Sequence, residues 1–385
     1  ISFLLLVMAT FALSEALIAD HGGVVPEDRE ALEALPGVAA VRFEVEEARL
    51  RVAGAERTTP SFMRLRLEGA DLALLHDGGP AGLRDTRVKL EIGASEPLGS
   101  GVLPAHWYRA WREMPAATRG VLRTYTVAAV HHDDAGALAA VDVDVLLTDH
   151  AGPGVDWARS EPVGDELVLV GPGAPEPGAT GEDADPVGLE YRPGSARDVV
   201  LIADATALPA ARAIAASEAG GPRRVRAVVT VPSEADRTEL GVRTDWVPGT
   251  ALVDRAVDVC ATTWLRWSRA RELRCGPVRP ARQVLPEVDI DAETLWETPW
   301  LLAHGAAGTD VSTTAALTGV ANGTSHGPTP EGLGTLSVER PPYFWVAGEA
   351  GDVVAVRRAL VRDLGVPRQR VAFMGYWRRG RAEVV

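Results

Sequence analysis

The sequence predicts a β-barrel domain followed by an α/β domain with a parallel sheet. Three observations support this fold class. From about residue 40 to residue 193, apolar and polar residues alternate in short runs, which is typical of antiparallel strands with one buried face. After residue 197, wholly apolar runs flank a helical stretch, as in a βαβ unit. The length of 385 residues also suits two domains of ordinary size.

The barrel is predicted for residues 41–193, after an N-terminal extension over 1–40 to which we assign no fold. Turns that carry glycine and proline separate its strands, as in a closed or nearly closed barrel. A short helix is expected near 105–113. The predicted strands begin at Val41, Met63, Leu122, Ala140 and Glu166.

The α/β domain is predicted for residues 197–385, after a linker near 192–197. A long insertion is expected at about 263–340, where several tryptophans precede a run rich in glycine, threonine and serine that contains a long loop. The predicted strands and helices of this domain occupy residues 198–203, 207–217, 224–231, 343–348 and 353–364.

The composition excludes several classes of protein. Lys and Arg number 39 against 53 Asp and Glu, and this net charge of −14 argues against a general nucleic-acid binder. Cys260 and Cys275 form no zinc or disulfide pattern, so we expect a reducing, cytoplasmic setting. The apolar run Ile1–Leu13 is too short to span a membrane and has no preceding Lys or Arg. A buried helix or an artefact is favoured there over a signal or anchor.

Three segments carry residues suited to a dinucleotide. On a barrel strand, alternation places Arg123 and Tyr125 on one face and Thr124 and Thr126 on the other. An arginine binds phosphate, a tyrosine ring stacks on a planar heterocycle, and a threonine hydroxyl bonds a ring nitrogen. A barrel strand with an exposed arginine is the alternative for this motif taken alone.

The other two segments lie between predicted elements. Gly152-Pro-Gly-Val-Asp-Trp-Ala158 allows backbone amides close to a pyrophosphate, with a helix expected to start near Trp157, although a plain turn is the alternative. Ile202-Ala-Asp-Ala-Thr-Ala-Leu-Pro209 follows the first α/β strand, where open sheets bind ligands. Its Asp204 and Thr206 also suit ordinary helix caps.

Taken together with Trp345-Val-Ala-Gly-Glu349 and Gly375-Tyr-Trp-Arg-Arg-Gly380, these segments occur in the order found in the siderophore-interacting FAD-binding proteins. The strand pair at Thr59–Leu72 also resembles that family. The resemblance covers about 41–260 and 341–383. It implies a ferredoxin-reductase-like fold and an FAD-dependent, NAD(P)H-linked ferric-siderophore reductase.

The resemblance also implies roles for individual residues. Arg123 would bind FAD phosphate, Tyr125 would pack on the isoalloxazine, and Thr126 would bond the flavin ring. The loop would hold the pyrophosphate and adenosine part. The full expected cofactor-binding set is Arg123, Thr124, Tyr125, Thr126, Thr148, Gly152, Gly154, Val155, Trp157, Ala158, Asp204, Thr206, Ala207, Gly348, Glu349, Tyr376 and Trp377.

The sequence departs from the family pattern at three places. Thr148-Asp149 replace a His-Gly pair, Val155 replaces a small hydroxyl residue, and Ala203-Asp-Ala205-Thr replaces Gly-Asp-Glu-Thr. These changes leave two alternatives: another flavin oxidoreductase, such as a flavin reductase, or a non-enzymatic binding protein. Other motifs have plainer interpretations: His131-His-Asp-Asp134 as a solvated turn, Trp296 and Trp300 as core, and Arg378, Arg379 and Arg381 as solvated charges.

No protein-bound metal and no catalytic acid–base pair are required, because the flavin would carry the chemistry. We expect a monomer that takes a ferric siderophore as its substrate. Lys89 is the sole lysine of the chain. Together with Arg87 on the same strand face, it is expected to attract an anionic ferric chelate.

Overall fold

The computed structural model describes residues 45–79, 83–94, 101–102, 107–148, 152–173, 188–276, 283, 285, 288, 295–299, 302 and 340–380. The run Ile1–Leu13, the Gly/Thr/Ser-rich run at 305–334, Trp300 and Arg381 lie outside the described residues. No helix in the described part of the chain is both long and apolar enough to cross a membrane.

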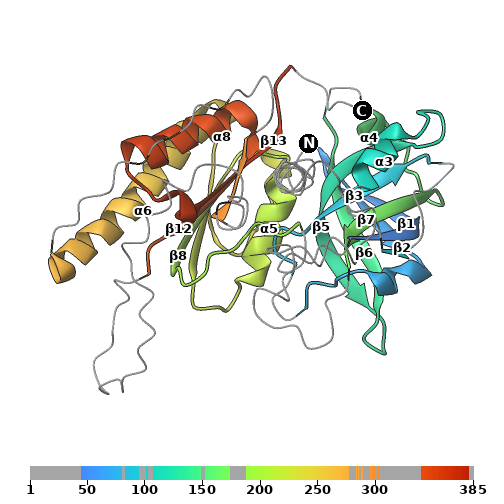
Figure 1. Cartoon of the computed structure of the whole chain (residues 1–385), viewed down its shortest axis with the longest axis horizontal. Helices are drawn as coiled ribbons and strands as arrows, with labels where there is room; N and C mark the ends of the chain where they lie inside the picture. Colours follow the sequence, from blue (N-terminus) through green and yellow to red (C-terminus); the bar gives the residue numbers. More distant parts are fainter. Residues whose placement is uncertain are drawn as a thin grey trace, which may run out of the picture.

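Six antiparallel strands close into a barrel in the first half of the chain (Figure 1). They follow one another in the order β2-β6-β5-β3-β7-β1, and β1 pairs again with β2 to complete the circle. A short strand, β4 (Gly101–Val102), pairs with β1 at the rim. The barrel strands are β1 Val45–Thr59, β2 Phe62–Glu68, β3 Arg87–Ile92, β5 Val121–His132, β6 Leu138–Leu146 and β7 Glu166–Pro172.

The period-2 alternation explains the barrel. One face of each strand fills the interior with buried valine and leucine, such as Val52, Leu65 and Leu90. On the opposite face of β2 and β6, Arg64 pairs with Asp144 and Arg66 with Asp142. Three short helices accompany the barrel: η1 Ala70–Leu74, α3 Trp107–Glu113 and α4 Pro153–Arg159.

The second sheet has six strands in the order β10-β9-β8-β12-β13-β11. Its first five strands run parallel, as predicted, but β11 pairs antiparallel with β13, so the sheet is mixed. The antiparallel edge was not expected, because two residues are too few to show a strand period. The strands are β8 Asp198–Ala203, β9 Arg224–Val229, β10 Arg243–Trp246, β11 Trp296–Glu297, β12 Tyr343–Glu349 and β13 Val371–Trp377.

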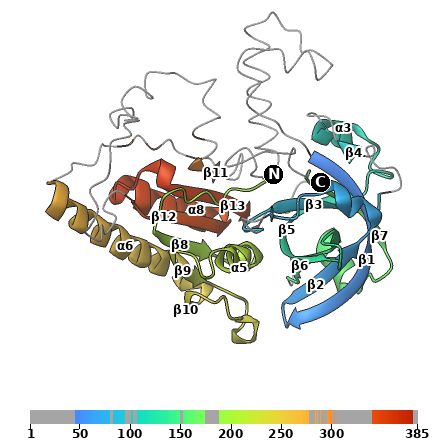
Figure 2. The same ribbon diagram turned by 90° about the horizontal axis from the view of Figure 1, so that it is seen from below.

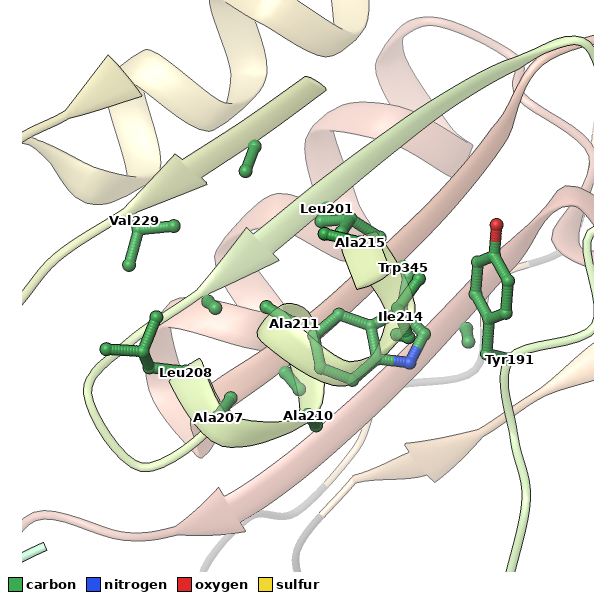
Figure 3. Close-up of a cluster of buried hydrophobic side chains, with 14 of the residues drawn as sticks. Tyr191, Leu201, Ala207, Leu208, Ala210, Ala211, Ile214, Ala215, Val229 and Trp345 are labelled. Carbon is green, nitrogen blue, oxygen red and sulfur yellow. The ribbon is translucent and has the colours of Figure 1, made fainter. Parts of the chain in front are cut away.

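Helices cover both faces of this sheet, which explains its continuous apolar strands. Alternate residues of β8 and β12 turn to opposite sides, so that Leu201 and Trp345 pack beside α5 while Ile202 and Phe344 pack beside α6 and α8. Figure 3 shows the first of these clusters, with Trp345 and Tyr191 beside the alanine-rich face of α5. The helices are α5 Leu208–Ser217, α6 Leu252–Cys275 and α8 Ala350–Arg357, with 3-10 turns η4 Glu234–Asp236, η5 Gly249–Ala251 and η8 Arg368–Arg370.

Two helices differ from the prediction. The expected helix at 353–364 is α8 followed by a π-helical turn, Arg358–Asp363. The stretch predicted as an insertion from residue 263 begins inside α6, which carries Trp264 and Trp267 and ends at Gly276 with φ 80°. Leu265 and Leu273 are exposed, so the second half of α6 has no clear apolar stripe. The hydrophobic periodicity therefore did not predict a helix there.

The barrel and the α/β domain lie side by side, with α5 between them (Figure 2). Carboxylates take part in the contacts that connect them. Asp144 of β6 accepts a hydrogen bond from Arg212 of α5 at 2.8 Å. Asp236 is fully buried and accepts bonds from Thr59, at 2.7 Å, and from Ser61 on the β1–β2 turn. These hydrogen bonds join the two domains, and the candidate site is built around their boundary.

Candidate functional site

The strand register decides which residues of β5 share a face. In the antiparallel pairing with β3, Thr124 lies opposite Lys89, Tyr125 opposite Val88, and Thr126 opposite Arg87. Opposite residues point to the same side of a sheet. The predicted separation of Arg123 and Tyr125 from Thr124 and Thr126 is therefore confirmed.

Helix α4 brings the glycine loop to Arg123 and Tyr125. Gly154 lies so close that an added Cβ would stand 2.8 Å from the Tyr125 hydroxyl and 3.2 Å from Arg123 Cγ. We call Arg123, Tyr125 and Gly154 the barrel cradle. The sequence by itself did not show that these three residues lie together. Only the order of the motifs, which resembles that of the family, suggested it.

The start of α4 corrects one expectation. The helix begins at Pro153, with Gly152 as its N-cap residue, rather than near Trp157. Proline at the first helical position favours this start. Ala158 is buried in the barrel core, and Val155 packs against that core, while Trp157 donates to Asp165 at 2.9 Å. Thr148 contributes its backbone carbonyl to a hydrogen bond from Arg159.

Lys89 and Arg87 do not form the solvent-facing patch that was expected. Both residues are 3 % exposed. Lys89 Nζ donates to Thr124 at 2.9 Å and lies over the Tyr108 ring, whereas Arg87 forms an ion pair with Glu190 at 2.8 Å. Helix α3 and the α/β domain cover this face of the barrel, which alternation alone could not show. The prediction that these two residues attract an anionic chelate at long range through exposed charges is therefore wrong. Direct substrate contact by either residue stays a prediction.

Asp204 forms hydrogen bonds at the ends of three parallel strands, β8, β12 and β13. It follows β8, and its carboxylate accepts hydrogen bonds from Thr206 at 2.8 and 2.5 Å, and from Ala207, Glu349 and Trp377 at 3.3, 2.9 and 2.6 Å. Burial raises the pKa of this carboxyl, and the bonds from Thr206 and Trp377 oppose that rise. Residues at the ends of β8, β12 and β13 therefore lie together at this sheet edge.

Gly348 allows that grouping. Its φ of 150° is one that L side chains rarely adopt, and an added Cβ would lie 2.7 Å from Asp204 Cγ. Glu349 then caps α8 through Asp352 and accepts a bond from the Arg379 amide at 3.0 Å. The C-terminal strand is thus fastened to the carboxyl end of β12.

A second group of residues lies where the barrel meets the α/β domain. The Trp296 ring contacts both the Arg87 guanidinium, 4.2 Å from its centroid, and the Tyr376 ring, stacked at 5.8 Å. Asp85 accepts bonds from the Tyr191 amide and from Trp345 Nε1, at 2.9 and 2.8 Å. We call Asp85, Arg87, Glu190, Trp296 and Tyr376 the interdomain cluster.

Sequence reasoning missed Asp85 and Glu190. Each is a charged residue in a segment without periodicity, and nothing local distinguishes it from a solvated loop residue. The one available signal was the pair of tryptophans at 296 and 300, and Trp296 was interpreted as core. That interpretation is confirmed, because Trp296 packs in the α5-side cluster. Near the hairpin, His131 and His132 bond Asp142 and Asp77 instead of meeting each other.

Two family models match most of the chain. The model described as siderophore-interacting FAD-binding domain matches residues 51–176, and the model described as siderophore-interacting protein matches residues 196–380. No curated protein matches this chain at a significant level.

Several solved structures are similar to the chain at low identity. The siderophore-interacting protein SipS from Aeromonas hydrophila is 21% identical, with 88% of this chain and 93% of that chain covered and a TM-score of 0.49. A siderophore utilization protein from T. fusca is 22% identical, with 90% and 97% covered and a TM-score of 0.47. A ferredoxin NADP+ reductase from Neisseria gonorrhoeae is 14% identical, with 86% and 98% covered and a TM-score of 0.39.

Proposed function

Since the chain belongs to the siderophore-interacting protein family, we propose that it is an FAD-dependent reductase that passes electrons from NAD(P)H to ferric siderophores. The observation that carries this proposal is the barrel cradle, where a helix N-terminus and an arginine meet beside a tyrosine ring. Helix N-termini and arginine both favour phosphate, and a tyrosine face favours a flat heterocycle.

The residues present fit an FAD molecule. A side chain at position 154 would fill the space beside Tyr125 and Arg123, so glycine keeps backbone amides accessible there. In the interdomain cluster, Arg87 Nη1, Glu190 Oε2 and the Tyr376 hydroxyl are buried without a hydrogen-bond partner in the part of the chain that the structure describes. Buried polar atoms without partners are costly, and a polar ligand that bonds to them removes this cost. The barrel cradle thus offers phosphate-binding groups, and the interdomain cluster offers polar atoms beside aromatic rings.

Different residues would hold different parts of the two cofactors. Arg123 and the first amides of α4 hold the pyrophosphate. Tyr125 would pack on the flavin ring, and the Thr126 hydroxyl would bond to it, as the family resemblance implies. Asp204, Thr206, Ala207, Gly348 and Glu349 form the nicotinamide side, where Trp377 closes the sheet edge.

When bound, FAD supplies the link between a two-electron donor and an acceptor that takes one electron at a time. One NAD(P)H therefore reduces two Fe(III) to Fe(II). Siderophores hold Fe(III) through hard oxygen donors, so reduction weakens their grip and releases the iron. We place this reaction in the cytoplasm, where NAD(P)H is available and where the two free cysteines stay reduced, and we propose a monomer as the working unit.

A direct test starts from purified protein supplied with FAD. We expect bound flavin with its visible absorbance, release of FAD rather than FMN by mass analysis, and bleaching by NADH or NADPH under anaerobic conditions. Trapping of Fe(II) should then follow addition of a ferric siderophore. A preparation that stays colourless after FAD addition would contradict the proposal and favour a non-enzymatic binder. Faster turnover with free flavin than with any ferric chelate would instead assign a flavin reductase.

A further inference from the structure

The interdomain cluster contains a charged pair that is removed from water and yet incompletely bonded. Arg87 Nη2 donates to Glu190 Oε1 at 2.8 Å, and the two residues are 3 % and 2 % exposed. A buried ion pair is favourable only when its remaining donors and acceptors are also satisfied. Here Arg87 Nη1 and Glu190 Oε2 have no partner among the described residues. The pair therefore offers one donor and one acceptor to a ligand.

A flat ring already occupies the adjacent space. The indole of Trp296 contacts the Arg87 guanidinium and stacks on the Tyr376 ring, with the two ring planes 11° apart. The indole N–H points at Glu190 Oε1, but the distance is 3.4 Å, which is long for such a bond. The Tyr376 hydroxyl is also buried without a partner among the described residues. A planar heteroaromatic ring with an N–H group thus already lies beside the pair, and it satisfies the pair's polar atoms poorly.

The backbone around Trp296 is firmly held. Strand β11 pairs with β13, and the neighbouring Glu297 accepts bonds from Arg357 at 2.7 Å and from Arg368 at 2.8 and 2.6 Å. These two arginines hold the pKa of Glu297 below its usual range despite its burial. A ring that enters this space therefore displaces only the indole, which turns about its own side-chain bonds.

The register connects this space to the proposed flavin contact. Arg87 lies opposite Thr126 across the β3–β5 ladder, and the two side chains share a face. The pyrimidine edge of an isoalloxazine carries a carbonyl, an N–H and a second carbonyl in sequence. A guanidinium donor beside a carboxylate acceptor complements such an edge.

We propose that Arg87 and Glu190 bind the pyrimidine edge of the flavin ring. Arg87 donates a hydrogen bond to a ring carbonyl, and Glu190 accepts a hydrogen bond from the flavin N3–H group instead of from the Trp296 indole N–H. This rests on FAD as the cofactor of the proposed function. Arg87 thereby becomes a cofactor contact rather than an attractor for iron chelates.

The test compares FAD with its N3-methyl analogue, which has no N3 proton. Each is titrated into flavin-free protein and followed by flavin fluorescence. We expect the unmodified chain to bind the analogue at least about tenfold more weakly, which corresponds to about 1.4 kcal/mol. Glu190→Ala should reduce this preference to within about twofold. The matched control is Glu218→Ala, since Glu218 is also buried and paired with an arginine, and it should keep the preference.

A second variant covers the case in which Glu190→Ala fails to fold. Glu190→Gln keeps the shape but removes a negative charge beside the ring, so the midpoint potential of bound FAD should shift upward relative to Glu218→Gln. Equal affinity of the unmodified chain for both flavins, or an unshifted potential in Glu190→Gln, would overturn this inference while FAD binding stands. Absence of FAD binding by the unmodified chain would overturn the proposed function and this inference with it.

Discussion

The barrel cradle and the interdomain cluster are built from different kinds of sequence. The cradle unites two segments about thirty residues apart, and each contains a short motif that indicates its chemistry before folding. The interdomain cluster unites residues 85, 87, 190, 296 and 376, and none of these is distinctive in its own segment. The charges also differ, because Arg123 is part-buried beside a helix N-terminus whereas Arg87 is buried against a carboxylate. The comparison sets a part-buried arginine that we propose binds a ligand against a buried arginine that pairs with a carboxylate and contacts Trp296 of the α/β domain.

The largest expected effect comes from breaking the Arg87–Glu190 pair. Arg87→Met leaves a carboxylate buried without its counter-ion, and we expect the free energy of unfolding without FAD to fall by about 3–5 kcal/mol. Urea unfolding measures it. Arg224→Met, which breaks an exposed pair with Asp198, is the control and should cost less than about 1 kcal/mol. The double variant Arg87→Met/Glu190→Leu should recover most of the loss; a single variant as stable as the control would remove the structural role of Arg87.

The next effect concerns Glu91, on the same face of β3. Burial, together with the nearby Glu47, raises its pKa to about 7, while a bond from Trp111 opposes the rise. Because the folded chain holds this proton more tightly than the unfolded chain, the contribution of Glu91 to stability is largest below pH 4.5 and falls as pH rises to about 7. The loss is at most about 3 kcal/mol.

Glu91→Gln should flatten this part of the pH profile. The difference in unfolding free energy between the parent and the variant, measured in urea from pH 4.5 to 8, isolates this group from the other carboxyls. A parent-minus-variant difference that stays constant over that range would show that Glu91 is ionised in the folded protein.

Arg123→Ala tests the other side of the comparison. Its loss should weaken FAD binding by about ten- to a hundredfold, because a charge-assisted contact is worth about 1.5–3 kcal/mol, while stability without FAD changes by less than about 1 kcal/mol. Fluorescence titration gives the affinity. Arg66→Ala, on the outer face of the barrel with Asp142, should leave FAD binding unchanged. Full flavin occupancy of Arg123→Ala after long dialysis would move the phosphate elsewhere.

The same contrast explains how much the sequence could predict. Alternation in β5 predicted the faces of Arg123 to Thr126, and the apolar runs of β8 and β12 predicted a sheet covered on both sides, because these patterns depend only on strand geometry. The burial of Lys89 and Arg87 could not be predicted, since it depends on α3 and on a domain more than a hundred residues away. Asp85 and Glu190 are recognisable only once Trp345 and Trp296 are seen to lie against them.

The smallest effect is expected at the sheet edge, between the two regions. Trp377 Nε1 donates to Asp204 at 2.6 Å, but the same carboxylate accepts four further bonds from Thr206, Ala207 and Glu349, so Trp377→Phe leaves it well satisfied. We expect a loss of about 0.5–1.5 kcal/mol in unfolding free energy. Removal of this donor also raises the Asp204 pKa further, since the Trp377 bond is one of those that lower it. A loss above about 3 kcal/mol in urea unfolding would contradict this expectation. It would show that the buried Asp204 carboxylate needs the Trp377 bond, and that this sheet edge contributes as much to stability as the interdomain cluster.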